Sequence, residues 1–196
     1  MLRARTDSGF SLVEVLVVMA VIGILASFAV PVVSNTISGY RLRNEAKTIS
    51  NLVGLAKMRA TSQFSRARVY GDLGTNQYSL QLWDKTNNRW VTEGVTYTMP
   101  FGVRFGFGVL DTPPPNTQPA IAMATQCTNN AGAVIGNTNC IVFNSRGIPI
   151  TAAGAPLGGN AFYMTDNIGV RAITVTATPL VREWWSPAHA SLWVRQ

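Results

Sequence analysis

The sequence predicts an α+β protein in which a long N-terminal helix packs on a mostly antiparallel β-sheet domain. The first observation is an apolar segment near the N-terminus that passes directly into helical periodicity. The second is a series of short β-rich segments, separated by turn residues, that starts at residue 66. Strands and helices do not alternate in this second part, so we do not expect the parallel sheet of a βαβ protein.

The apolar segment covers residues 12–33, where Glu14 is the only charged residue. As a helix it would be about 33 Å long, enough to cross a hydrocarbon core of about 30 Å. The preceding residues 1–9 are polar and carry two arginines, which favour the cytoplasmic side of a membrane. We therefore expect residues 10–33 to span the membrane once and to leave the C-terminal domain on the exported side.

A small residue and a charged residue distinguish the start of this segment. A secretory signal carries its small cleavage residue after the apolar core, whereas Gly9 lies before it, so cleavage there would leave the helix on the mature chain. Glu14 would cost a few kcal/mol inside the membrane unless it were paired or close to the interface. It could reach the lipid headgroups, or it could pair with the amine that cleavage creates on Phe10 of a neighbouring subunit.

The run GFSLVE at residues 9–14, with an apolar stretch that ends at Pro31, resembles the class III signal of type IV pilins and type II secretion pseudopilins. The resemblance implies that a prepilin peptidase cuts between Gly9 and Phe10 and methylates the new amine of Phe10. It also implies that Glu14 sets the register of a filament and that Pro31 kinks the helix.

The same resemblance implies the partners and the location of the protein. The partners are the prepilin peptidase, other pilins or pseudopilins of the filament, and an inner-membrane assembly platform. The protein would lie in the bacterial inner membrane with a single span and a periplasmic C-terminal domain. From there it would be assembled into a periplasmic pseudopilus or a surface pilus.

Beyond Pro31 the apolar residues recur at helical spacing, at Leu42, Ala46, Ile49, Val53, Ala56 and Ala60. Separations of three and four residues place this set on one face of a helix. We expect the helix to run from Phe10 to about Gln63, with its second half lying on the β-rich domain. The chain then divides into a leader at 1–9, a membrane-spanning and filament-core helix at 10–33, an amphipathic continuation at 34–65 and a globular domain at 66–196.

Short runs of β-branched and aromatic residues predict the strands of this domain. These runs lie at residues 69–70, 78–83, 89–92, 103–109, 141–143 and 170–178, with a less pronounced one at 162–164. Residues 84–88 predict a hairpin loop between two of the strands. The strand at 103–109 is predicted from an alternation of valine and phenylalanine with arginine and glycine.

Cys127 and Cys140 lie in one stretch rich in asparagine, glycine and threonine. A structural zinc site needs about four cysteine or histidine ligands, and the only histidine, His189, is far away in the sequence, so we expect no metal and no other cofactor. In a reducing cytosol both thiols would stay free, whereas export of the domain favours a disulfide between them. The predicted compartment therefore favours the disulfide.

Composition and motifs give no support to a catalytic function. Charged residues make up 13% of the chain, and the formal charge of +7 comes from basic residues that are scattered rather than grouped in runs. His189 has no nucleophile motif beside it. Gly102, Gly106 and Gly108 lie in a strand-like alternation and not in a phosphate loop. We therefore expect that the protein is not an enzyme.

Two further motifs resemble a narrower group, the minor pseudopilin H family of type II secretion, which includes related minor pilins of the pilus tip. They are AKMRA at 56–60, which leads into residues 68–69, and IVFNSRG at 141–147. The resemblance implies a structural subunit near the tip of a type II secretion pseudopilus or a type IV pilus. The alternative is a minor pilin that binds DNA or another ligand for uptake or adhesion.

The C-terminal region bears on that alternative. One branch of the family binds DNA through a Gly-Arg-x-Arg element, whereas residues 178–182 read TPLVR here, so we do not expect nucleic-acid binding. Trp184, Trp185 and Trp193 follow closely in the sequence. We expect these tryptophans to pack in the core or at a sheet edge, with partner binding as the alternative.

Overall fold

The computed structural model describes residues 11–166 and 168–196, excluding the side chains of residues 28–35. Contacts divide the chain into two compact units. Unit 1 is Met1–Ile37 and unit 2 is Ser38–Gln196. Each unit is described below by itself.

One helix, α1 (Leu12–Ser62), contributes to both units. Its last residue agrees with the predicted end near Gln63. Among the residues that the structure describes, no helix is both long enough and apolar enough to cross a membrane. The predicted span at 10–33 includes residues outside that description, and it stays a prediction.

In unit 2, α1 buries the face that the sequence pattern predicts. Its buried apolar positions include Leu42, Ala46, Ile49, Val53, Ala56 and Ala60. Three of the six are alanines, whose short side chains let the helix backbone lie close to the strands. The predicted packing of a helix on an antiparallel β domain is therefore confirmed.

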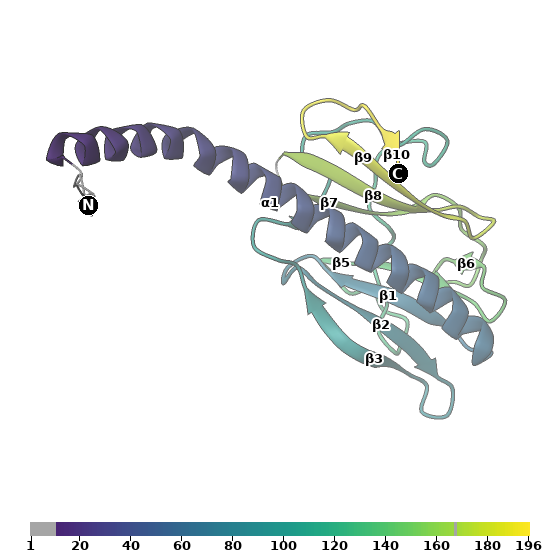
Figure 1. The fold of residues 1–196 in the computed structure, drawn as a ribbon. Coiled ribbons are helices and arrows are strands. Elements are labelled where there is room, and N and C mark those ends of the chain that lie inside the picture. The colour runs from purple at the N-terminus through teal and green to yellow at the C-terminus, as the bar shows by residue number, and fades with distance from the viewer. Residues whose placement is uncertain (1–10, 167) are drawn as a thin grey trace, which may run out of the picture. The chain divides into compact units, whose positions relative to one another are not determined.

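Within the described residues, two five-stranded sheets pack against this part of α1 (Figure 1). Sheet A has the order β3-β2-β1-β5-β6 and consists of β1 (Ala67–Asp72), β2 (Gln77–Asp84), β3 (Arg89–Thr98), β5 (Thr138–Phe143) and β6 (Pro149–Ile150). Sheet B has the order β10-β9-β8-β7-β4 and consists of β4 (Arg104–Phe105), β7 (Asn160–Thr165), β8 (Gly169–Val175), β9 (Val181–Pro187) and β10 (Val194–Arg195). Neighbouring strands of both sheets run antiparallel throughout the described part of the chain.

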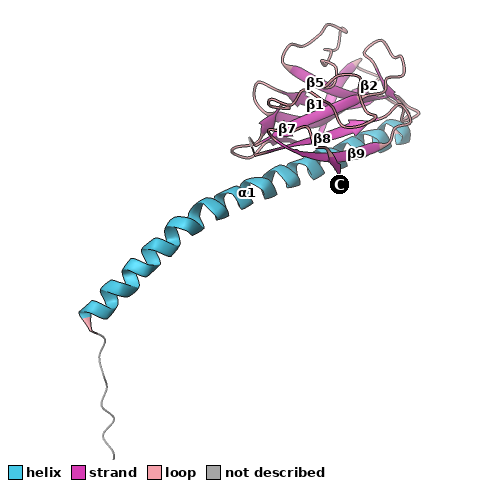
Figure 2. Ribbon diagram, turned by 90° about the horizontal axis from the view of Figure 1, so that it is seen from above, coloured by secondary structure: helices cyan, strands magenta, loops and turns pink. Residues whose placement is uncertain are grey.

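The main core lies between α1 and the facing sides of both sheets. Tyr78 of β2, Phe143 of β5 and Phe162 of β7 are among its largest buried side chains. A second apolar cluster covers the other face of sheet B, where Tyr163 and Trp184 pack with residues of the loop that follows β4. Figure 2 shows this layering within unit 2, with α1 on one side of the strands and loops on the other.

The strand predicted at 103–109 is wrong in extent, because ladder pairing is limited to the two residues of β4. Gly106 and Gly108 have φ angles of 136° and 62°, in the left-handed region that ends a strand. The alternation still has a structural meaning. Phe105 packs in the main core and Phe107 packs against the second cluster, so the turn delivers the two rings to different faces of sheet B.

Sheet B also contains strands that the sequence pattern marks weakly or not at all. Residues 162–164 belong to β7, in which all six residues are buried. Since α1 covers one face of this strand and loops cover the other, its sequence cannot show polar alternation. The strand predicted at 170–178 corresponds to β8, which ends at Val175, and β9 lies entirely beyond residue 178, where the prediction stops. In sheet A, β3 reaches Thr98 rather than residue 92.

Candidate functional site

Gly9 and Phe10, the residues of the predicted processing site, lie outside the residues that the structure describes. The description begins at Ser11, directly before α1. The Ser11 Oγ accepts a hydrogen bond from the Glu14 N–H at 3.2 Å, and the Ser11 carbonyl accepts one from the Val15 N–H at 3.2 Å. Ser11 is therefore the N-cap of the helix.

Glu14 occupies the third helical position after that cap. Ser-x-x-Glu is the sequence signature of a capping box, and a carboxylate in the first turn interacts favourably with the helix dipole. Glu14 thus lies where an acidic side chain favours the start of α1, besides the pairing across subunits that the sequence predicts. This local role could have been found without a structure, because the spacing of Ser11 and Glu14 is visible in the sequence.

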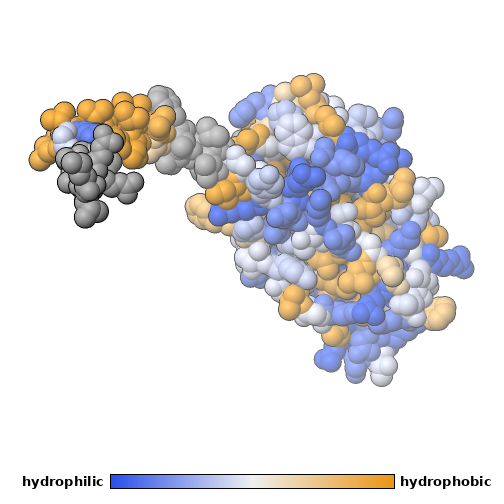
Figure 3. Space-filling model, in the orientation of Figure 1, coloured by the Kyte–Doolittle hydropathy of each residue, from blue (hydrophilic) through white to orange (hydrophobic). Residues whose placement is uncertain are grey.

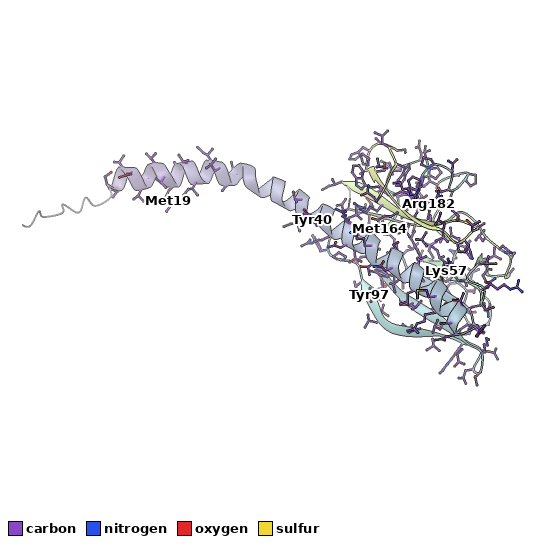
Figure 4. The ribbon with its side chains drawn as sticks, turned by 45° about the vertical axis from the view of Figure 1, so that its right-hand side comes forward. Met19, Tyr40, Lys57, Tyr97, Met164 and Arg182 are labelled. Carbon is purple, nitrogen blue, oxygen red and sulfur yellow. A yellow bond between two sulfur atoms is a disulfide. The ribbon has the colours of Figure 1, made fainter. Side chains whose placement is uncertain are left out.

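Beyond this cap, unit 1 carries a dense apolar surface, which Figure 3 shows in orange. The leucine, isoleucine, valine and methionine side chains of residues 12–25 are each between 46% and 76% exposed. Figure 4 labels one of them, Met19. An apolar surface of this extent is stable only when lipid or protein covers it. Pro31 lies within α1, but its side chain is outside the described set, so the predicted kink stays a prediction.

Cys127 and Cys140 are joined by a disulfide, which closes the loop between them over a sequence separation of 13 residues. Cys140 lies on β5, opposite Tyr70 of β1, so one end of the loop is fixed in sheet A. Both cysteines are buried. The disulfide that the predicted compartment favours is therefore present in the structure.

The disulfide loop is also held by contacts to sheet A. The Arg68 Nη1 of β1 donates a hydrogen bond to the Thr128 carbonyl at 2.7 Å. The Trp90 N–H of β3 donates one to the Asn130 Oδ1 at 2.9 Å. The loop is therefore attached to three strands of the sheet, through β5 by covalent chemistry and through β1 and β3 by hydrogen bonds.

Arg68 belongs to a stack of arginine and tryptophan side chains that the sequence analysis missed. The Arg68 guanidinium lies 4.0 Å from the centre of the Trp90 ring, and that of Arg66 lies 4.4 Å from the centre of the Trp83 ring. The two tryptophans meet edge to face, with ring centres 5.2 Å apart. Burial lowers the pKa of Arg68 to about 10, so the side chain stays charged at neutral pH.

The partners in this stack come from β1 and the residue before it, from β2 and from β3, so no single stretch of sequence contains them. A weak signal was present in the spacing of Arg66, directly before β1, and Arg68 in β1, since residues two apart in extended chain point to the same side. The Arg68 guanidinium lies between an aromatic face and a carbonyl oxygen, and both contacts favour burial of its positive charge. The stack therefore serves to fix the disulfide loop on the sheet.

The arginines that the DNA-binding alternative would need are not presented as a cluster. Arg171 of β8 is buried and pairs with Glu183 of β9, with 2.6 Å between Nη1 and Oε1. Burial lowers the pKa of Arg171, and the facing carboxylate of Glu183 opposes that shift. Arg182 is half-buried on the neighbouring strand.

The tryptophans of the C-terminal region take part in packing, as the sequence predicts. Trp184 is 7% exposed, and its indole N–H donates to the Thr174 Oγ1 at 2.9 Å. The Trp193 indole N–H donates to the Thr112 carbonyl at 2.8 Å, and its ring lies 6.0 Å from that of Tyr163. The C-terminal segment is thereby fastened to the loop that covers sheet B.

Among the residues that the structure describes, the candidates singled out from the sequence are not brought together as a catalytic group. His189 is exposed after β9. Among the described residues, no three histidine, cysteine or acidic side chains are grouped in a way that could hold a metal ion.

Comparisons with known proteins place this chain by its N-terminal segment. No curated protein matches the chain. Among solved structures, two of the minor pseudopilin EpsH from the type 2 secretion system of Vibrio cholerae are similar to it. The first is 10% identical in sequence, with a TM-score of 0.45, and covers 76% of this chain and 99% of that one. The second is 12% identical, with a TM-score of 0.45, and covers 77% and 97%.

The family model of the prokaryotic N-terminal methylation motif matches residues 4–30. This range contains Gly9, Phe10 and Glu14, on which the resemblance to type IV pilin signals was based. The predicted pilin-like signal is therefore confirmed: the chain carries a prokaryotic N-terminal methylation motif.

Proposed function

We propose that this protein is a minor pilin or pseudopilin, a structural subunit that is anchored in the inner membrane and assembled near the tip of a filament. The observation that carries the proposal is the methylation motif at residues 4–30, joined through α1 to a helix-on-sheet domain. In this proposal a prepilin peptidase cuts between Gly9 and Phe10 and methylates Phe10. The filament is a type II secretion pseudopilus or a type IV pilus.

The exposed apolar surface of unit 1 supports an assembly role. In the membrane, lipid tails would cover the side chains of residues 12–25, and in a filament the helices of neighbouring subunits would cover them. Lipid tails are about as apolar as leucine, so exchanging one cover for the other changes the free energy little. Transfer from membrane to filament must therefore depend on more specific groups than the apolar side chains.

Glu14 is the group that distinguishes the two surroundings. In lipid, its carboxylate lacks a partner unless it reaches the headgroups. In a bundle of mature helices, the Phe10 amine of the next subunit supplies a cation, and an ion pair with additional hydrogen bonds makes burial of both charges tolerable. The pairing would favour assembly and would fix the axial position of the incoming subunit.

The shifted pKa values of unit 2 agree with a structural role. Burial is the largest cause that raises the pKa of Tyr78, whose hydroxyl donates to the Glu45 Oε2 at 2.5 Å and so joins β2 to α1. Arg68 holds the disulfide loop. Groups of this kind fasten elements to one another, whereas catalytic groups with shifted pKa values face a cleft.

The test is the processing and assembly of the full chain in cells that contain a prepilin peptidase. Intact-mass analysis of the membrane fraction should give a chain that begins at a methylated Phe10. Gly9→Val should leave the precursor uncut, because a branched side chain would crowd the peptidase site, and it should be absent from sheared filaments. A mature chain that begins elsewhere, or an uncut chain that still enters filaments, would contradict the proposal.

A further inference from the structure

Phe64, directly after the end of α1, combines two unfavourable features. Its backbone is in the left-handed region, with a φ of 49°, and its side chain is 74% exposed. In the described part of the chain, the other non-glycine residues with a positive φ are all asparagines, which tolerate this conformation. Phe64 thus has a strained backbone and gains little from burial. Strain of this kind at an exposed aromatic residue indicates a role outside the fold.

Two adjoining cavities lie beside Phe64, where the β2–β3 hairpin meets the end of α1 in unit 2 (Figure 1). The larger cavity has a volume of about 550 Å³, and the smaller one, which Phe64 lines, has a volume of about 310 Å³. Ser65, Trp83 and Lys85 line both cavities. The two therefore form one continuous depression, which we call the hairpin groove.

The larger cavity offers room for an apolar group. Its walls include the side chains of Leu82 and Val91, and Val91 is 41% exposed. A volume of about 550 Å³ lies within the range of sites that bind small ligands. An aromatic or branched aliphatic side chain of a partner would fit there and would cover the exposed part of Val91.

The main chain of β3 brings hydrogen-bonding groups to the groove. β3 is an edge strand of sheet A, so one side of its main chain has no neighbouring strand. The Trp90 N–H donates to the Asn130 Oδ1 and therefore points away from β2. Because alternate residues of a strand direct their main-chain groups to the same side, those of Thr92 also point away from β2. Thr92 lines the larger cavity, where an extended peptide can pair with it.

The groove carries an excess of positive charge when every carboxylate is counted as negative. Two carboxylates line it. Hydrogen bonds from Asn87 lower the pKa of Asp84, and Glu93 forms an ion pair with Arg59, with 2.5 Å between Oε1 and Nη2. Four cations line the groove or lie opposite these carboxylates, namely Arg59, Arg66, Lys85 and Arg89. Four cations against two carboxylates leave two positive charges in excess.

We propose that the hairpin groove binds an extended, acidic segment of a partner protein. An apolar side chain of the segment would occupy the larger cavity, its main chain would pair with Thr92, and its carboxylates would face Lys85 and Arg66. Phe64 would pack on the bound segment, which explains why it stays exposed. All of these residues belong to unit 2, so the inference goes beyond the proposed membrane anchoring and does not depend on it.

Two other occupants match the groove less well. Nucleic-acid bases bind by stacking on free aromatic rings, whereas the guanidinium groups of Arg66 and Arg68 already cover Trp83 and Trp90. A second copy of this chain would bring the same excess of positive charge, and the formal charge of the chain is +7. Like charges at an interface oppose association, so an acidic partner is favoured over a second copy.

The test measures the binding of fluorescent peptides to the full chain, held in nanodiscs of phosphatidylcholine, by fluorescence anisotropy. The acidic peptide has about eight residues, the length of an ordinary strand, in which valine alternates with glutamate around a central phenylalanine. The neutral peptide has glutamine in place of every glutamate. A short labelled DNA duplex and the concentration dependence of the chain's own oligomeric state test the two other occupants.

The acidic peptide should bind about tenfold more tightly than the neutral peptide, and high salt should remove the difference. Lys85→Gln should weaken the binding of the acidic peptide about threefold and leave that of the neutral peptide unchanged. Lys47→Gln is the matched control, because it changes an exposed lysine of α1 that does not line the groove. It should leave the binding of both peptides unchanged.

Phe64→Gly should weaken the binding of the acidic peptide about tenfold, because a phenylalanine covered by a ligand loses that burial. The same substitution should stabilise the folded domain, since it relieves the left-handed backbone. A residue with only a structural role would not show these opposite effects on binding and stability. Phe101→Ser, at a phenylalanine that is 93% exposed elsewhere, should leave peptide binding unchanged.

Equal affinity for the acidic and neutral peptides would overturn the proposal, and so would unchanged binding in Phe64→Gly. Absence of saturable binding of the acidic peptide up to the millimolar range would also overturn it. DNA that binds more tightly than the acidic peptide, and is released by Lys85→Gln, would assign the groove to nucleic acid instead. Self-association that Phe64→Gly abolishes would assign it to a second copy of the chain.

Discussion

The guanidinium of Arg68 and the carbonyl of Thr128 form a 2.7 Å hydrogen bond that fastens the disulfide loop to β1. The same side chain donates from Nε to the Gln81 Oε1 at 2.8 Å and is 3% exposed. The loop thus covers a charge, and the charge holds the loop. The burial of Arg68 and the position of the disulfide loop depend on each other, so substituting Arg68 tests how much this contact contributes to the stability of unit 2.

Replacing Arg68 should loosen the loop and weaken the fold. Arg68→Met keeps much of the side-chain length but removes the charge and every donor, so the Thr128 carbonyl loses its partner. A hydrogen bond to a charged group contributes about 1.5–3 kcal/mol, and the free energy of unfolding should fall by about that amount. Urea denaturation measures the loss, and amide exchange should quicken at residues 128–134. Arg146→Met, at an exposed arginine, is the control, and equal stability of the two variants would contradict the prediction.

The disulfide should contribute a comparable amount. Closing a loop of this length is worth about 3 kcal/mol in the chain-entropy model. Replacing both Cys127 and Cys140 by alanine should therefore lower the free energy of unfolding by about 3 kcal/mol, and reductant should destabilise the native chain but not the double variant. Labelling of both thiols by an alkylating agent, without reduction, in protein from its native compartment would show that the bond does not form there.

Phe64 offers a substitution that should stabilise the protein. It follows the last turn of α1 with a φ of 49°, and the Ser65 N–H donates to the Ala60 carbonyl at 3.1 Å, as in a Schellman motif. The left-handed conformation costs a residue with a Cβ about 1–2 kcal/mol, and Phe64 is 74% exposed, so it gains little from burial.

Phe64→Gly should therefore raise the free energy of unfolding by about 1 kcal/mol, measured by urea denaturation. Phe64→Ala is the matched control, because it removes the ring and keeps the strain. If the glycine and alanine variants are equally stable, the backbone conformation at this position is not strained.

The contrast between α1 and sheet B shows which parts of the fold a sequence can reveal. The buried face of α1 is readable because one side of the helix meets the core and the other meets solvent, which imposes a period on the apolar residues. β7 has no such contrast, since both of its faces are covered, and its short apolar run looks like any buried segment.

At β7 the sequence pattern marks a real strand only weakly, whereas at residues 103–109 it predicts a strand that is longer than the real one. Alternating valine and phenylalanine predicted one strand, yet Gly106 and Gly108 adopt left-handed backbone and turn the chain out of the ladder. Sequence alone does not say whether a glycine is a small strand residue or a turn.

In the candidate site, too, some features were readable from the sequence and others were not. The methylation motif depends on local spacing and was readable from Gly9, Phe10 and Glu14 alone. The stack around Arg68 depends on residues that are distant in the chain, such as Arg68 and Thr128, and only the fold brings them together.

Substitutions at Glu14 and Ser11 can distinguish a local role of Glu14 in the helix cap from a role between subunits. Glu14→Gln keeps the shape and the capping ability of the side chain but removes its charge. Glu14→Val removes both the capping ability and the charge. Ser11→Ala weakens the cap by about 1 kcal/mol and keeps the carboxylate. The three variants therefore change cap and charge in different combinations.

If the charge pairs with the Phe10 amine of a neighbouring subunit, both Glu14 variants should be cleaved and inserted normally but poorly recovered in sheared filaments. Ser11→Ala should then assemble like the native chain, because its carboxylate is intact. Recovery that falls for Ser11→Ala and Glu14→Val, but not for Glu14→Gln, would assign the effect to the cap. Normal recovery of both Glu14 variants would show that the carboxylate reaches the headgroups and does not set the register. Because unit 2 has its own core, none of the variants should alter its unfolding, so a change in recovery reports on assembly alone.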